Sequence, residues 1–240
     1  MTKYSILFKI YIITSSCIFQ SCISTTNMQS ARPLKKYHWV FKSSFGFQSI
    51  KNIQTEDKDL DHALEGLQIP FLELGLRYGL SEKIELGVKY NTPFTGTMNS
   101  RYNLMNDDRF AVSTGLDFGY GQFSLKPNTE SQTWKIYETK IGLFSTYEFS
   151  RTMGVHGSLG FLNRFNRVEA HDQYADSQVE VHRYLSTTVG CNYKFIFLET
   201  GIVKSISSPE FFYSLAMGIV YPLDNVIRPD EENDNLNEDK

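Results

Sequence analysis

The chain has 240 residues, a high aromatic content of 14% and a formal net charge of −3. This length suits one domain of ordinary size, and the single cysteine beyond residue 22, Cys191, excludes a disulfide framework. Past the N-terminus no run of about 20 apolar residues occurs, which excludes a helical membrane protein. The acidic charge is concentrated at 223–240, so the nearly neutral body lacks the basic patch that nucleic-acid binding requires.

The first residues have the pattern of a bacterial export signal. Two lysines precede an apolar stretch, Ile10 to Phe19, that is too short to span a bilayer. Its end, Phe19-Gln20-Ser21-Cys22, resembles the lipobox of bacterial lipoproteins, whose cysteine is lipidated and becomes the first mature residue. We therefore expect a lipoprotein-type signal peptide at 1–21 and lipidation of Cys22. Ordinary cleavage beside an incidental cysteine is the alternative.

Residues 22–36 are polar and patternless, and we expect them to form a periplasmic tether. From Tyr37 onward, apolar and polar residues alternate with a period of two, which predicts β-strands with unlike faces. The clearest example is LELGLRYGLSEKIELGVKYN at 72–91, where Ser81-Glu82-Lys83 predicts a tight hairpin turn. The predicted strands cover about 37–49, 67–80, 84–94, 97–105, 109–123, 134–149, 153–164, 180–193, 195–206 and 210–222.

These ten strands predict an all-β, up-and-down antiparallel barrel over residues 37–222, followed by an acidic disordered tail at 223–240. Short connections fall on one side and longer ones on the other, as in outer-membrane barrels with short periplasmic turns. An even strand number also returns both termini to the same side, where a lipid on Cys22 would need the chain to start.

The direction of the apolar face distinguishes two kinds of barrel. A soluble lipid carrier has the apolar face inside, whereas a transmembrane barrel has it outside, against lipid. Aromatic residues at strand ends and glycines on the opposite face favour the transmembrane barrel. Four charged residues should then face the interior, either as ion pairs that fill a narrow lumen or as a constriction that selects solutes: Glu73, Arg77, Glu85 and Lys89.

Two segments carry a resemblance to a known class of protein. ELGLRYGLSEKIELGVKY and a last strand ending in an aromatic residue, YSLAMGIVY, resemble small bacterial outer-membrane β-barrel (porin-like) proteins across residues 37–222. The resemblance implies an outer-membrane location with periplasmic termini, contact with outer-membrane lipid, and recognition of the last strand by the barrel-insertion machinery. It also implies a non-enzymatic role, as a narrow passive pore for small solutes or as a structural or surface-interaction protein.

One pair of residues suggests an enzyme instead. His156 and Ser158 lie two apart, and this His-x-Ser pair resembles the one on the catalytic strand of outer-membrane lipid A deacylases. The alternative functions are therefore a lipid-modifying hydrolase that uses this pair and, with the apolar face inside, a soluble periplasmic lipid-binding barrel. The sequence lacks zinc spacing, a phosphate-binding glycine loop and a nucleophile elbow, so we expect no cofactor and no metal.

Overall fold

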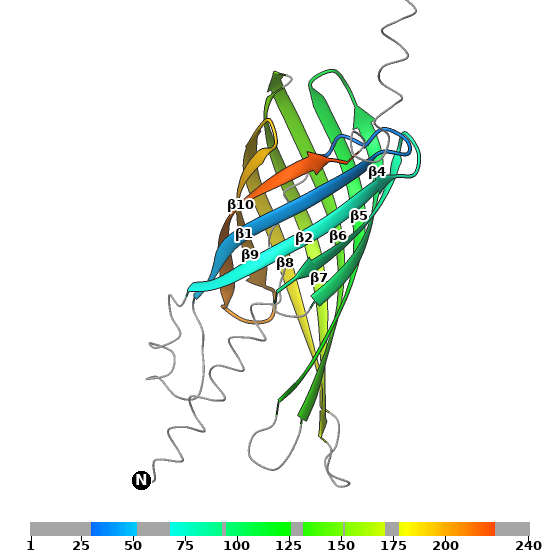
Figure 1. The fold of residues 1–240 in the computed structure, drawn as a ribbon. Helices are drawn as coiled ribbons and strands as arrows, with labels where there is room; N and C mark the ends of the chain where they lie inside the picture. Colours follow the sequence, from blue (N-terminus) through cyan, green and yellow to red (C-terminus); the bar gives the residue numbers. More distant parts are fainter. Residues whose placement is uncertain are drawn as a thin grey trace, which may run out of the picture.

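The computed structural model describes residues 30–51, 68–92, 95–125, 132–150, 152–170 and 178–223. Each strand in these ranges pairs antiparallel with its neighbours in the chain, and β1 pairs with β10, so the sheet closes into a ten-stranded barrel (Figure 1). The strands are β1 (Trp39–Lys51), β2 (Gln68–Gly79), β3 (Ile84–Asn91), β4 (Thr95–Asn106), β5 (Phe110–Leu125), β6 (Gln132–Ser150), β7 (Met153–Ala170), β8 (Gln178–Tyr193), β9 (Ile196–Ser205) and β10 (Phe211–Pro222).

This architecture confirms the predicted all-β, up-and-down antiparallel barrel. The predicted signal peptide at 1–21, Cys22, and the tail after Leu223 lie outside the described residues. In the part of the chain that the structure describes, no helix is long and apolar enough to cross a membrane.

The two ends of the barrel differ in their connections. Tight turns join β2 to β3, β4 to β5, β6 to β7 and β8 to β9 at the end where β1 begins and β10 finishes, which we call the short-turn end. In the first turn the N–H of Leu80 donates to the carbonyl of Ile84 at 2.9 Å. In the last, Lys194 has a φ of 53°, the left-handed conformation that so short a turn requires. The opposite end is called the long-loop end.

The two faces of the sheet are chemically opposite. Leu74, Leu86 and Ile219 point outward and are 37%, 43% and 49% exposed. The inward-facing Glu73 and Glu199 are 0% and 1% exposed. A soluble carrier would present its polar groups to water and enclose its apolar side chains. In this barrel the polar groups are enclosed and the apolar side chains form the outer surface. This is the face arrangement of a transmembrane barrel, whose closed sheet also satisfies every strand edge.

Aromatic side chains mark two levels on the outer surface. Phe110 lies beside Tyr147 in the register of β5 and β6, and Tyr120 lies beside Tyr137 ten positions further along each strand. The rings of Tyr120 and Tyr137 are 5.3 Å apart. At a rise of about 3.4 Å per residue and a tilt of roughly 40°, these levels are about 26 Å apart along the barrel axis. That separation matches the apolar band of an outer-membrane barrel, about 25 Å tall.

Strands β5 to β8 extend further at the long-loop end than the sequence predicted. The strand predicted at 153–164 runs from Met153 to Ala170. The apolar alternation stops near Asn163, which suggested the end of the strand, but backbone pairing continues to Gln132 opposite Ala170. The hairpin persists because its hydrogen bonds depend on the neighbouring backbone and not on an apolar face.

Candidate functional site

The lumen of the barrel contains a network of buried charges and is the candidate site. At its centre Glu73 of β2 forms an ion pair with Lys42 of β1 and lies 3.8 Å from the ammonium of Lys89 on β3. Lys89 also reaches to 4.0 Å from the carboxylate of Asp117 on β5. One carboxylate therefore holds cations from both neighbouring strands, and this arrangement compensates part of the cost of removing the charges from water.

Further ion pairs occupy the lumen away from this centre. Arg77 pairs with Glu85 across β2 and β3, and the Nε of Arg164 donates to Glu138 at 2.8 Å across β6 and β7. The structure thus places all four charged residues that the sequence singled out in the lumen, as Glu73 with Lys89 and as Arg77 with Glu85. It adds Lys42, Asp117, Glu138, Lys140, Arg164 and Glu199, which the same strand parity could have revealed.

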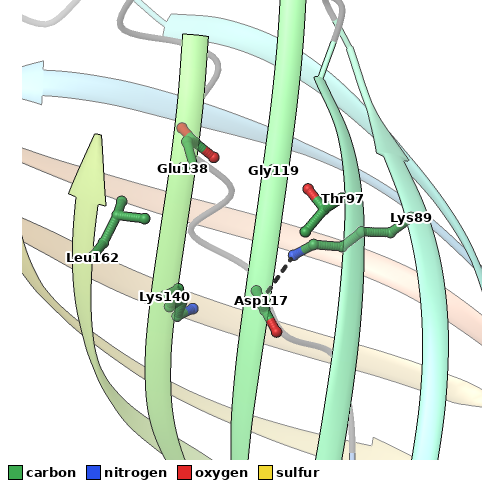
Figure 2. Close-up of a pocket in the computed structure, with 7 residues that line it drawn as sticks. All are labelled: Lys89, Thr97, Asp117, Gly119, Glu138, Lys140 and Leu162. Carbon is green, nitrogen blue, oxygen red and sulfur yellow. Dashed lines mark ion pairs between the residues drawn. The ribbon is translucent and has the colours of Figure 1, made fainter. Parts of the chain in front are cut away.

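Little space remains among these side chains. Figure 2 shows Lys89 of β3 reaching toward Asp117 of β5, with Glu138 and Lys140 on the adjacent strand β6. The cavity that they line with Thr97, Gly119 and Leu162 has a volume of about 10 Å³. This is close to the minimum that accommodates one water molecule, so a solute larger than water would enter this cavity only by displacing the side chains that line it.

Inward-facing glycines permit this close filling. A Cβ atom at Gly46 of β1 would lie 2.5 Å from the carbonyl oxygen of Leu215 and 2.7 Å from the ring of Phe71. At Gly190 it would lie 2.5 Å from Nε2 of His156. The crowded interior that the glycine-rich face predicted is therefore present, and at these two positions it excludes any larger residue without rearrangement.

His156 and Ser158 both face the lumen, but they have different partners. His156 Nε2 lies 3.0 Å from Oε2 of Glu199 on β9, and the rings of His156 and Phe197 are in contact. The hydroxyl oxygen of Ser158 lies 2.8 Å from that of Thr188 on β8. A base and a carboxylate that could orient it are thus together, but both are enclosed and face away from the lipid.

The segment before β1 enters the mouth of the barrel at the short-turn end. Residues 30–36, here called the N-terminal plug, lie across this opening, as the dark blue trace before β1 in Figure 1 shows. The N–H of Ala31 donates to the Thr146 hydroxyl at 2.6 Å, and Ala31 is 1% exposed against Ala111 and Phe144. Arg101 Nη1 donates to the carbonyl of Ser30 at 2.7 Å while its guanidinium lies 3.9 Å from the Phe144 ring centroid.

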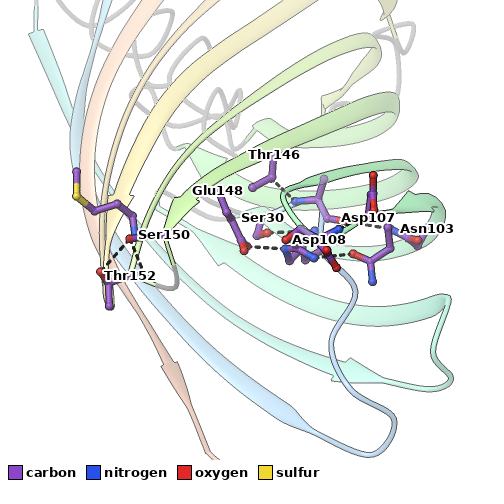
Figure 3. A network of polar contacts seen from close by, with 12 residues as sticks. Ser30, Asn103, Asp107, Asp108, Thr146, Glu148, Ser150 and Thr152 are labelled. Atoms are coloured by element: carbon purple, nitrogen blue, oxygen red, sulfur yellow. Dashed lines mark hydrogen bonds and ion pairs between the residues drawn. The ribbon is translucent and has the colours of Figure 1, made fainter.

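Arg32 holds the plug to the same part of the rim, at β4 and β6. Its Nε lies 2.6 Å from the carboxylate of Glu148. Its Nη1 donates to the side chain of Asn106 at 3.0 Å, and its Nη2 donates to the carbonyl of Asp108. Figure 3 shows Ser30, Asp108, Thr146 and Glu148 gathered at this part of the rim. At the other side of the mouth the N–H of Leu34 donates to Glu85. The plug therefore contacts the wall of the mouth from β3 to β6.

These contacts differ from the expected patternless tether at 22–36. The described part of that segment is bound to the barrel wall mainly through its own backbone groups. Backbone N–H and C=O groups occur in every sequence, so no side-chain pattern indicated the binding. Arg32 makes the side-chain contacts, but as one of three basic residues in a polar stretch it gave no distinct signal.

Among the described residues, no group of three or more His, Cys, Asp or Glu side chains could hold a metal ion.

The closed sheet, the apolar exterior and the charged lumen define the fold as that of a transmembrane β-barrel. No family model matches the chain, and no curated protein matches its sequence. Among solved structures, the attachment invasion locus protein Ail of Yersinia pestis has 8% identity and a TM-score of 0.40, over 78% of this chain and 99% of that one. The outer membrane protease OmpT from Escherichia coli has 10% identity and a TM-score of 0.45, over 80% and 100%. The translocator domain of the autotransporter NalP from Neisseria meningitidis has 7% identity and a TM-score of 0.43, over 88% and 95%.

Proposed function

We propose that the chain is a bacterial outer-membrane β-barrel with a closed lumen, which serves a structural or surface-interaction role. The outward direction of the apolar face carries the membrane location: Leu74 and Ile219 are exposed while Glu73 is fully enclosed. Exposed apolar surface over a whole barrel is unfavourable in water and favourable in hydrocarbon. A soluble lipid carrier would have its apolar face inside the barrel and its polar face in water, which is the reverse of this arrangement.

Two features support a closed lumen over a passive pore. Ion pairs between neighbouring strands occupy the interior, and the N-terminal plug lies across the short-turn end. A barrel of about eight strands is just filled by side chains, and ten strands enclose only slightly more space. Solutes would have to displace both the plug and the ion pairs.

The experiment has two parts. Outer membranes are extracted with detergent, and the chain should migrate faster before heating than after, as a folded membrane barrel does. In planar bilayers the purified full-length chain should then give no step-like conductance. Absence from the outer-membrane fraction would overturn the location, and steady open-channel currents would overturn the closed lumen.

For orientation, the short-turn end with both chain ends lies in the periplasm and the long-loop end lies outside the cell, as short periplasmic turns suggest. Lipidation of Cys22 accords with this orientation, because a periplasmic lipid would meet the inner leaflet. Labelling cells with radioactive palmitate should mark the wild-type chain and leave Cys22→Ala unlabelled. Equal labelling of both chains would exclude Cys22 as the lipidated residue.

One observation favours a second candidate, a lipid-modifying hydrolase. His156 has a carboxylate partner in Glu199. A nucleophilic hydroxyl requires a base and a group that orients the base, and His156 and Glu199 could fill these two roles. Two facts argue against it: the Ser158 hydroxyl contacts Thr188, and the pair lies inside the barrel beside Thr146, which binds the plug. Acyl chains of the surrounding lipid lie on the other side of the sheet.

A further inference from the structure

Among the strand residues whose side chains the structure describes, the charges on the outer surface are all of one sign. Within this set of residues, every acidic side chain lies on the lumen side of the sheet. The outward-facing charged residues are all basic, they occur on four consecutive strands, and each lies toward the long-loop end: Lys135 on β6, Arg167 on β7, Arg183 on β8 and Lys204 on β9. We call these four residues the outer basic row.

Strand register brings two of them close together. Lys204 lies directly opposite Leu185, and Arg183 is the next outward residue on β8. Diagonal neighbours of this kind have Cα atoms roughly 7–8 Å apart, within reach of long side chains. Asn163 lies opposite Arg183 and adds a polar group on the same face. The other two, Lys135 and Arg167, are opposite one another in the register of β6 and β7.

The surroundings of Arg183 are apolar. Leu185 and Val181, the outward residues on either side of it along β8, are 51% and 48% exposed. A cation on the lipid-facing surface is costly at the bilayer centre and tolerated near the interface, where anionic groups are available. Arg183 lies ten positions from Tyr193 along β8, the same separation as between the two aromatic levels on β5 and β6, and Lys204 is its diagonal neighbour on β9. Both therefore lie at interface depth and within reach of acyl chains.

We propose that the outer basic row binds the phosphate groups of lipid headgroups in the leaflet around the long-loop end, with Arg183 and Lys204 as the principal ligands. This proposal rests on the membrane location proposed above. The guanidinium of Arg183 can contact two phosphate oxygens at once, and Lys204 contributes a point charge beside it. The apolar residues around them match the acyl chains of a phospholipid, whereas a soluble polyanion would leave those residues in water.

The test uses the purified full-length chain in phosphatidylcholine vesicles with a trace of spin-labelled phosphatidic acid or spin-labelled phosphatidylcholine. The fraction of motionally restricted label measures the preference of the barrel surface for each lipid. We expect the wild-type chain to prefer phosphatidic acid about fivefold or more, as expected for basic residues near an anionic surface. The preference should fall in 1 M salt, because salt screens exposed charges.

Two double variants locate the effect. Arg183→Gln with Lys204→Gln should remove most of the preference for phosphatidic acid. Lys83→Gln with Lys194→Gln removes two exposed cations at the short-turn end and should leave the preference unchanged. Equal loss in both variants, or an unchanged preference in the first, would overturn the proposal. Faster gel migration before heating shows in each case that the barrel has inserted, so failure to insert would instead count against the proposed membrane location.

Discussion

The backbone N–H of Ala31 donates to the hydroxyl of Thr146 at 2.6 Å, joining the segment before the first strand to the inner face of β6, 115 positions later in the chain. Arg32, the next residue, pairs with Glu148 two positions further along the same strand. These adjacent contacts hold the N-terminal plug against the wall at the short-turn end.

Arg32→Ala should loosen the plug. The substitution removes the ion pair to Glu148 and the hydrogen bonds to Asn106 and Asp108 together. We expect trypsin to cleave after Lys35 and Lys36 several times faster than in the wild type, and conductance in planar bilayers to rise. Lys36→Ala is the control for conductance, because Lys36 is exposed and its ammonium lies over the Tyr37 ring, away from the contacts of Arg32. Unchanged cleavage and conductance in Arg32→Ala would show that this residue does not hold the plug.

Glu73→Gln should destabilise the barrel strongly. Glu73 is fully enclosed and is the shared partner of Lys42 and Lys89, so its loss leaves cations buried without their main counter-charge. Breaking a buried pair in this way costs about 3–5 kcal/mol of the free energy of unfolding. Urea unfolding in detergent measures the change. Glu82→Gln, in an exposed turn, should stay within about 0.5 kcal/mol of the wild type, and a similar small effect at Glu73 would contradict the paired lumen.

Gly46→Ala should impair closure of the barrel where β1 meets β10. The added methyl would lie 2.5 Å from the backbone oxygen of Leu215 and 2.7 Å from the Cβ of Ala216, and backbone atoms cannot move aside as a flexible side chain can. Overpacking of this kind costs about 1–3 kcal/mol. The matched control is Gly96→Ala, where the added Cβ would have its nearest neighbour, the backbone oxygen of Tyr120, at 3.9 Å. The folded fraction on an unheated gel compares the two, and equal folding would show that the seam tolerates the methyl.

Leu143→Arg tests whether the outer surface faces hydrocarbon. Leu143 points outward between Tyr137 and Tyr147 on β6 and is 51% exposed. An arginine near the bilayer midplane should lower the free energy of unfolding by about 2–4 kcal/mol, and near an interface by at most about 1 kcal/mol. Phe149→Arg, on the same face at the short-turn end of β6, supplies the interfacial comparison. Urea unfolding in phosphatidylcholine vesicles measures both, and equal small effects would indicate that this surface faces water.

His156→Ala separates a structural role from the hydrolase. If His156 only fills the lumen and pairs with Glu199, the composition of lipid A in cells should not change, while the barrel becomes less stable because Glu199 stays buried without this partner. Mass spectrometry of extracted lipid A provides the measurement. Loss of a deacylated species in the variant, with the barrel still folded, would establish the enzymatic alternative.

The sequence by itself determined the barrel. A strand in lipid belongs to a closed sheet and has one face toward lipid and one toward the lumen, and these unlike faces leave a period-two pattern in the sequence. Leu74, Leu86 and Ile219 revealed the outer face in this way, and strand parity placed Glu73 and Lys89 inside. Strand ends beyond Asn163 escaped prediction because pairing there depends on the neighbouring strand.

Only the tertiary structure decided which charges meet and what occupies the mouth. Glu73 joins Lys42 and Lys89 because its strand, β2, pairs with β1 on one side and with β3 on the other. Parity alone places these charges in the lumen but does not assign their partners. The N-terminal plug was invisible in the sequence because backbone groups make several of its contacts, including those of Ala31 and Ser30. Backbone hydrogen bonds carry no residue signature, so their partners become known only when the barrel is closed.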